Sequence, residues 1–143
     1  MLRVAVIPIQ LISIEEEGYH LLVHAKINSK AATLLIDTGA SRSVFDLKKI
    51  KKFVPEHSFS PNEKLSTGLG TNSMETMTTL ISLMQFGKLK IKDFQTVLLD
   101  LRHVNESYRK LGLEEIDGVV GNDLLVPHRA VINYPKKEMR LRW

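Results

Sequence analysis

Apolar and polar residues alternate with a period of two in several parts of the chain. Between residues 21 and 28, apolar residues occupy every odd position, and the stretches 77–83 and 139–143 repeat the pattern. This period is typical of a strand that buries one face. We therefore expect a mainly β fold.

Other segments predict further strands. The run Val4–Ile14 is apolar, and Pro8 within it marks a strand edge or a bulge. Two more strands are expected at 89–94 and 97–101, and a hairpin at 130–143 closes the chain.

Short helices are expected between some of these strands. Apolar residues recur at helical spacing in 43–54, in 102–112 and in 122–126. The second of these segments reaches Gly112, a residue type that commonly ends a helix. Two or three short helices are therefore predicted.

A carboxylate follows one of the most apolar segments. Leu34 to Ile36 offer no polar face and predict a buried strand, which ends at Asp37. Thr38 and Gly39 then turn the chain, and we expect Gly39 to adopt backbone angles that a residue with a Cβ resists. A carboxylate delivered in this way is costly unless it is paired, hydrogen-bonded or used. Taken alone, the triplet is more typical of an ordinary turn at the end of a strand.

A second stretch, far downstream, makes the Asp-Thr-Gly triplet much more specific. Val119 and Val120 run into Gly121, and a short predicted helix follows. Together with the run Asp37-Thr38-Gly39-Ala40, this stretch resembles the retropepsin-like aspartic proteases, the single-domain family that includes the retroviral proteases. The resemblance covers roughly residues 18–143. It implies one domain over 1–143 with its core at about 18–143, folded as a closed acid-protease-like β-barrel with a flap hairpin and one lobe per chain.

The resemblance implies an aspartic endopeptidase. In that chemistry two adjacent aspartates share a proton, and the ionised one activates a water molecule that attacks the peptide bond. No metal and no cofactor are required. The chain has one Asp-Thr-Gly, so the resemblance implies a homodimer in which each subunit supplies its Asp37.

The resemblance also assigns roles within the site. The catalytic turn would consist of Asp37, Thr38 and Gly39. A protein or peptide substrate would lie in extended form against the residues that follow the turn and under the flap, expected in 65–76. An ordinary Gly-rich turn is the alternative for that segment. The substrate-binding set is Ala40, Ser41, Gly68, Leu69 and Gly70.

Two residues depart from the family pattern. Retroviral proteases usually carry Asp where Ser41 stands and Arg where Asn122 stands, and that ion pair supports their dimer. Its absence bears on dimer stability. The alternative from another functional class is a non-catalytic dimeric peptide-binding module with the same fold. Such modules usually lose the Asp or the Gly, and because Asp37 and Gly39 are both intact, the enzyme is favoured.

Composition excludes several other classes. The chain has 143 residues, of which 43% are hydrophobic, and no cysteine, so disulfides and a cysteine nucleophile are excluded. No apolar run approaches the roughly 18 residues that span a bilayer, so no membrane partner is expected. The N-terminal residues lack the basic region and cleavage site of a signal peptide, which predicts a cytoplasmic location.

Charge and histidines suggest no additional partner. The formal net charge is +4, with basic residues in 48–52 and 136–142, but aromatic residues make up 6% and do not interleave with them. A solvated basic face is therefore expected, and no nucleic-acid binding. His20 and His24 lie four residues apart in a predicted strand, roughly 13 Å from each other, too far to share a metal ion. We expect surface histidines.

Overall fold

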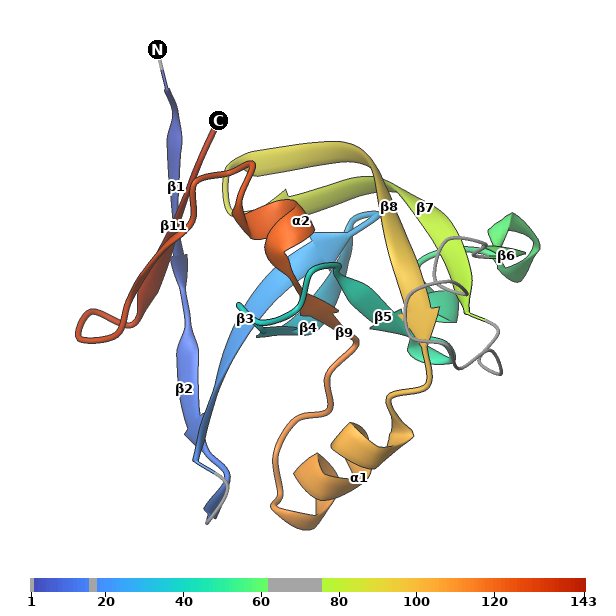
Figure 1. Ribbon diagram of the computed structural model, residues 1–143, viewed down its shortest axis with the longest axis horizontal. Coiled ribbons are helices and arrows are strands. Elements are labelled where there is room, and N and C mark those ends of the chain that lie inside the picture. Colours follow the sequence, from blue (N-terminus) through green and yellow to red (C-terminus); the bar gives the residue numbers. More distant parts are fainter. Residues whose placement is uncertain (1, 16–17, 62–75) are drawn as a thin grey trace.

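A closed barrel forms the body of the computed structural model, which describes residues 2–15, 18–61 and 76–143 (Figure 1). The strands pair in a ring, and β7 returns to β3 to close it. In ring order they are β3 (Tyr19–Ile27), β4 (Lys30–Ile36), β9 (Gly118–Val120), β5 (Val44–Asp46), β8 (Leu89–Leu99) and β7 (Met77–Phe86). The predicted barrel of the acid-protease type is confirmed.

Two short strands extend the barrel sheet beyond this ring. β2 (Gln10–Ser13) pairs with β3, and β6 (Ser60–Pro61) pairs with β7. The sequence predicted that β3 buries its odd-numbered residues, and Leu21, Val23 and Ala25 are indeed buried in the barrel. Leu22 is buried as well, since it faces a second apolar cluster outside the barrel.

A separate three-stranded sheet brings the two ends of the chain together. Its order is β1 (Val4–Pro8), β11 (Glu138–Arg142), β10 (Val131–Asn133). Pro8 ends β1, so the apolar run 4–14 divides into strands of two different sheets. Ala5 and Ile7 of β1 are buried in the main hydrophobic core. The hairpin predicted at 130–143 is confirmed.

The helices are short. α1 (Arg102–Lys110) connects β8 to the segment before β9, and Gly112 follows it with a φ of +71°. α2 (Asn122–Leu125) comes directly after β9. Two turns of 3-10 helix, η2 (Lys49–Lys52) and η3 (Glu56–Ser58), lie between β5 and β6. The helices predicted at 102–112 and 122–126 are confirmed.

Two sequence-based predictions about the elements are wrong. Residues 43–54 do not form one helix, because Val44 and Phe45 pair with β8 and β9 in the barrel and only Lys49–Lys52 turns helically. Residues 89–101 do not form two strands, since β8 runs without a break from Leu89 to Leu99. In the first case pairing with distant strands outweighs the local pattern. In the second, pairing with the hairpin neighbour β7 along almost all of β8 keeps the strand continuous.

A second apolar cluster packs α1 against the outside of the barrel. Its buried members are Ile14, Leu22, Tyr108, Ile116 and Val119. Figure 1 shows α1 at the bottom of the view, below the barrel strands. The cluster joins α1 to the outer face of the strands that lead to Asp37, so this helix is in a position to influence the site.

The predicted flap, with Gly68, Leu69 and Gly70, lies outside the described residues. Among the helices that are described, none is both long enough and apolar enough to cross a membrane.

Candidate active site

The two sequence stretches that defined the resemblance meet at one point of the barrel. β4 runs parallel to β9, and Leu34, Leu35 and Ile36 pair with Gly118, Val119 and Val120. One step beyond, the backbone N–H of Asp37 donates to the carbonyl of Val120 at 3.0 Å. A segment 83 residues further along the chain therefore fixes the backbone of Asp37.

The turn after β4 leaves the Asp37 side chain open to solvent. Its Oδ1 accepts a hydrogen bond from the backbone N–H of Gly39 at 2.9 Å, and its carbonyl accepts one from the N–H of Ala40 at 3.1 Å. Asp37, Thr38 and Gly39 are all exposed. The backbone thus fixes one carboxylate oxygen while the group remains accessible.

Gly39 does not adopt the special backbone angles that the sequence predicted for it. Its φ is not positive, so the turn does not require a glycine for its backbone angles. What a side chain would change is the space beside the carboxylate, because a Cβ at position 39 would lie 3.3 Å from Asp37 Oδ1. Gly39 lets its own N–H approach that oxygen.

Asn122 supports the turn where retroviral proteases usually have an arginine. Its side-chain amide donates to the carbonyl of Thr38 at 2.9 Å, and its backbone N–H donates to the carbonyl of Ala40 at 2.8 Å. Ser41, the other departure from the family pattern, is exposed. A neutral pair of hydrogen bonds therefore ties α2 to the turn.

Sequence reasoning missed a buried serine that joins the same segments. Ser43 donates its backbone N–H and its hydroxyl to Asp123 Oδ1, at 2.9 and 2.7 Å, and its hydroxyl oxygen accepts the N–H of Gly121 at 2.9 Å. Arg42 lies 3.8 Å from the other oxygen of Asp123. The sequence signal was faint: an acid in the first turn of a predicted helix, with no indication of its partner 80 residues away.

Gly121 is the residue whose backbone needs space. A Cβ there would lie 2.8 Å from the carbonyl oxygens of Ala40 and Arg42. Real Cβ atoms do not approach backbone that closely, so any side chain would push the two segments apart. This close approach explains the glycine after Val119 and Val120.

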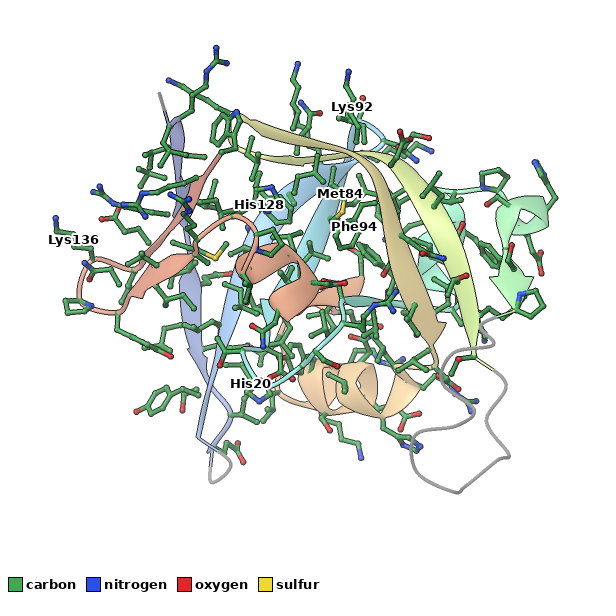
Figure 2. All side chains as sticks on the ribbon, turned by 45° about the horizontal axis from the view of Figure 1, so that its top comes forward. His20, Met84, Lys92, Phe94, His128 and Lys136 are labelled. Atoms are coloured by element: carbon green, nitrogen blue, oxygen red, sulfur yellow. The ribbon has the colours of Figure 1, made fainter. Side chains whose placement is uncertain are left out.

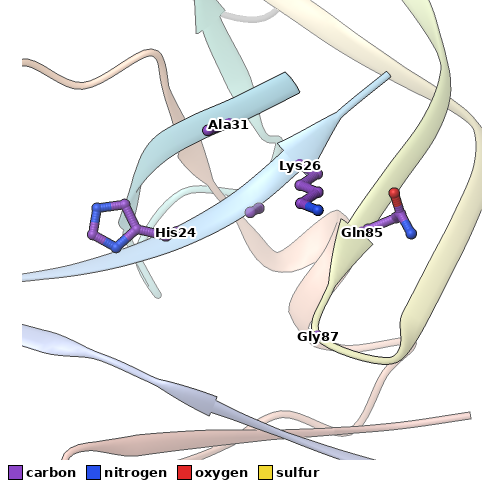
Figure 3. Close-up of a pocket in the computed structure, with 6 residues that line it drawn as sticks. His24, Lys26, Ala31, Gln85 and Gly87 are labelled. Atoms are coloured by element: carbon purple, nitrogen blue, oxygen red, sulfur yellow. The ribbon is translucent and has the colours of Figure 1, made fainter. Parts of the chain in front are cut away.

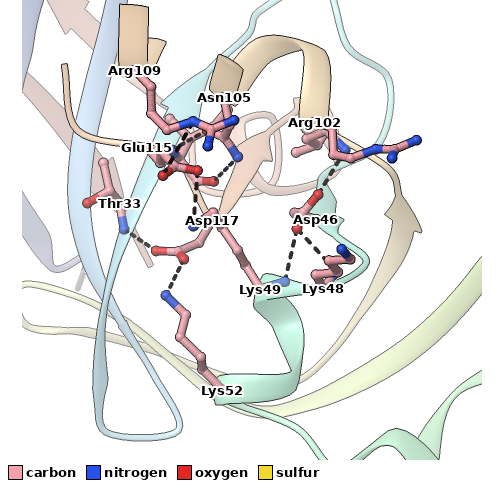
Figure 4. A network of polar contacts seen from close by, with 12 residues as sticks. Thr33, Asp46, Lys48, Lys49, Lys52, Arg102, Asn105, Arg109, Glu115 and Asp117 are labelled. Carbon is pink, nitrogen blue, oxygen red and sulfur yellow. Dashed lines mark hydrogen bonds and ion pairs between the residues drawn. The ribbon is translucent and has the colours of Figure 1, made fainter. Parts of the chain in front are cut away.

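Other carboxylates nearby are fully engaged in holding the fold (Figure 4). Asp117 is buried and accepts the N–H of Thr33 at 2.9 Å and the Lys52 ammonium at 2.7 Å. Asp46 is also buried and accepts three backbone N–H groups at 2.8 to 3.2 Å. Asp117 and Asp123, which lack the Asp-Thr-Gly pattern, thus have structural partners, whereas Asp37 faces solvent.

A cavity of about 280 Å³ opens beside Asp37, and we call it the Asp37 cavity. One wall comes from the start of β3, and another from the end of β4. It is lined by Tyr19, His20, Leu21, Leu35, Ile36, Asp37, Thr38 and Tyr134. His20 is half-buried and bonds to Tyr108 of α1, so it is not the surface histidine that the sequence predicted (Figure 2).

A second cavity, of about 260 Å³, lies on the other side of the turn and is called here the α2 cavity. Thr38, Asn122 and Arg129 supply its polar lining. Leu125, Val126, Ala130 and Ile132 supply apolar surface. Val126 is 68% exposed. An exposed apolar surface thus adjoins the turn that carries Asp37.

Other hollows lie away from the turn. A cavity of about 420 Å³ is lined by residues of β3, β4 and β7 and by Gly87, among them His24, Lys26 and Gln85 (Figure 3). None of the described residues that line it carries a carboxylate. Within residues 2–15, 18–61 and 76–143, no group of three or more acidic or histidine side chains is arranged to hold a metal ion.

Comparison with known families agrees with this geometry. The sequence profile of the aspartyl protease family matches residues 23–124, which include both the Asp37 turn and Gly121. The chain belongs to the aspartyl protease family, and its fold is that of the retropepsin-like members. No curated protein sequence matches the chain.

Solved structures share the fold at low sequence identity. A retropepsin-like aspartic protease from Rickettsia conorii is 16% identical and has a TM-score of 0.61, with 100% of this chain and 93% of that chain covered. The retroviral protease-like domain of Ddi1 from Leishmania major is 15% identical with a TM-score of 0.53, covering 81% and 82%. The EIAV protease in complex with the inhibitor HBY-793 is 18% identical with a TM-score of 0.50, covering 74% and 85%.

Proposed function

We propose that this protein is an aspartic endopeptidase that acts as a homodimer, with a catalytic dyad formed by Asp37 of each subunit. The observation that carries the proposal is the state of Asp37 itself. Its backbone is fixed by β9 and its Oδ1 by Gly39, yet the carboxylate faces solvent beside a cavity. The other acids near this turn, Asp46, Asp117 and Asp123, all have structural partners.

The chemistry follows from two carboxylates across a two-fold axis. Such a pair shares one proton because both groups cannot ionise side by side. The ionised Asp37 takes a proton from a water molecule, and that water attacks the peptide carbonyl. The protonated Asp37 of the partner subunit donates a hydrogen bond to the carbonyl oxygen. Collapse of the tetrahedral intermediate, with a proton delivered to the leaving amine, completes hydrolysis.

Exposed apolar side chains near the turn support a second copy as partner. Val126, Val131 and Tyr134 are 68%, 47% and 56% exposed. Val126 lines the α2 cavity and Tyr134 the Asp37 cavity, and both cavities include Thr38. An isologous contact here would bring each Asp-Thr-Gly turn against its copy.

The substrate in this proposal is a protein or peptide segment in extended form. Ala40 and Ser41 follow the catalytic turn and are at least partly exposed, so they are available to contact it. The flap residues Gly68, Leu69 and Gly70 remain a prediction from the sequence.

A subunit-mixing experiment tests the dyad. Asp37→Asn keeps the size of the side chain and removes its charge, so the mutant dimer should assemble but not cleave a denatured protein substrate. When native and mutant chains are mixed equally and allowed to exchange, about half of the native chains pair with a mutant chain. Activity per native chain should then fall to about half.

Exchange is verified by mass spectrometry of mass-tagged subunits, and a native-only sample at the same total concentration is the control. If activity per native chain stays constant after proven exchange, Asp37 acts within one subunit and the dyad is wrong. If native protein binds peptides without cleaving any, the chain is a peptide-binding module instead.

A further inference from the structure

His20 and Asp37 occupy neighbouring positions on adjacent strands. The antiparallel register that pairs Leu21 with Ile36 places His20 opposite Asp37 one step further on. Both residues line the Asp37 cavity. A half-buried imidazole therefore stands beside the proposed catalytic carboxylate.

Tyr108 fixes this imidazole from outside the barrel. The Tyr108 hydroxyl lies 2.6 Å from Nδ1 of His20, and the ring centroids are 5.8 Å apart. Tyr108 is 1% exposed and packs among the second apolar cluster, whose other members include Leu22 and Ile116. Among the described residues, the hydrogen-bond partner of the Tyr108 hydroxyl is His20.

The direction of this hydrogen bond determines which ring nitrogen carries the proton. Burial raises the pKa of Tyr108 to about 12, so its hydroxyl keeps its proton under ordinary conditions. Among the described residues this buried hydroxyl has no other acceptor for its hydrogen, so in the neutral ring it donates to Nδ1 and the ring proton lies on Nε2. The ring then retains one N–H donor, and no hydrogen bond to Nε2 forms among the described residues.

The remaining surface of the cavity is suited to a side chain with an aliphatic stem. Leu21, Leu35 and Ile36 supply apolar wall, and the polar groups that line it beside His20 include Asp37 and Thr38. Pockets of this kind fix orientation with a few placed polar groups. A carboxylate in the ligand would be repelled by Asp37, whereas a neutral carboxamide would not.

We propose that His20 is a specificity-determining residue, positioned by Tyr108, whose Nε2–H binds the side-chain carbonyl of a glutamine or asparagine in the substrate. The inference rests on the proposed function, because it assigns a substrate side-chain preference to the Asp37 cavity of the same site. Tyr108 is a positioning residue here, since it acts through His20.

The test begins with the cleavage sites that the native protein selects in a mixture of proteome-derived peptides, read by mass spectrometry. Glutamine and asparagine should be enriched at one position. Paired synthetic peptides then carry either glutamine or methionine there, since methionine has similar length and no strong acceptor. We expect kcat/KM to favour the glutamine peptide about tenfold, as one hydrogen bond allows.

Three variants locate the source of that preference. His20→Leu should bring the glutamine-to-methionine ratio near one, and Tyr108→Phe should lower the ratio part of the way. A merely structural role of Tyr108 would lower kcat/KM for both peptides equally. His24→Leu is the matched control, because His24 lies on the same face of β3, does not line the Asp37 cavity, and should leave the ratio unchanged.

Binding measurements separate this inference from the proposed function. Asp37→Asn protein is titrated with the same two peptides, with and without His20→Leu, and the dissociation constants are compared. Absence of cleavage by native protein, together with a His20-dependent preference in binding, would overturn the endopeptidase and keep the subsite. Equal treatment of the two peptides, a preference that survives in His20→Leu, or no binding at all would overturn the subsite.

Discussion

The side-chain amide of Asn122 donates to the backbone carbonyl of Thr38 at 2.9 Å. In the retroviral proteases that the sequence resembles, an arginine stands at this position and forms an ion pair. Here one neutral residue connects α2 to the turn twice, because its backbone N–H also donates to Ala40. The support for the turn is therefore internal to one subunit and independent of charge.

Asn122→Ala should lower the free energy of unfolding by about 1 kcal/mol, since it removes one partly exposed side-chain hydrogen bond and keeps the backbone bond to Ala40. The measurement is urea unfolding at a fixed protein concentration, because dimerisation would make stability concentration-dependent. Asn122→Asp is the comparison. It places an acceptor against the Thr38 carbonyl and should cost more than Ala. Equal stability of all three proteins would contradict this role.

Gly121→Ala should mainly lower stability, whereas Gly39→Ala should mainly lower turnover. At position 121 the new Cβ meets the backbone of Ala40 and Arg42 at 2.8 Å, so we expect a loss of about 1–3 kcal/mol of stability. At position 39 it meets only Asp37 Oδ1 at 3.3 Å, so stability should change by less while turnover falls. Thermal unfolding and peptide hydrolysis measure the two effects. Similar loss of stability in both variants would be inconsistent with this contrast.

Tyr108 predicts a loss of stability in alkaline solution. Burial raises its pKa to about 12, above the roughly 10 expected for the unfolded chain. Between these two values the native state holds a proton that the unfolded chain has released, so the free energy of unfolding falls as pH rises.

Tyr108→Phe lacks this proton, and the two proteins share every other ionisable group. The stability difference between native protein and variant, measured by urea unfolding at pH 8, 10 and 11.5, should therefore move in favour of the variant above pH 10. A difference that does not change with pH would refute the buried, protonated phenol.

Val126→Glu should raise the dissociation constant of the proposed dimer at least tenfold. The substitution replaces an exposed apolar side chain close to the Asp37 turn with a charged one. Sedimentation velocity over a range of concentrations gives the dissociation constant. Activity should recover at high protein concentration, as expected when assembly is the only defect. Leu80→Glu is the matched control, since Leu80 is 51% exposed on β7 and lines neither the Asp37 cavity nor the α2 cavity. If both variants dimerise like native protein, the dimer uses another surface.

Patterns within short stretches of the sequence correctly predicted several individual strands and one helix end. The period of two gave β3 and β11, and Gly112 marked the end of α1. The apolar run before Asp37 correctly indicated a buried strand that delivers a carboxylate to a turn.

The remainder depends on partners far apart in the chain. Val44 and Phe45 were assigned to a helix because helical spacing reaches them from η2, whereas β8 and β9 recruit them into the barrel. Ser43 gave no sign that it would hold Asp123 and Gly121. The sequence predicts His20 as a surface residue, because nothing near it in the chain indicates Tyr108, the partner that fixes it from a helix 88 residues later.

The pairing of β1 with β11 has a consequence for how the chain can be rearranged. Arg3 and Trp143 exchange both backbone hydrogen bonds, at 2.7 and 3.1 Å, so the two ends of the described chain lie side by side (Figure 1). Ends this close can be joined by a short linker, and new ends opened in the turn at 134–137 would leave every strand pair intact. The same proximity would let the unit be inserted into a surface loop of another protein as a self-contained cassette.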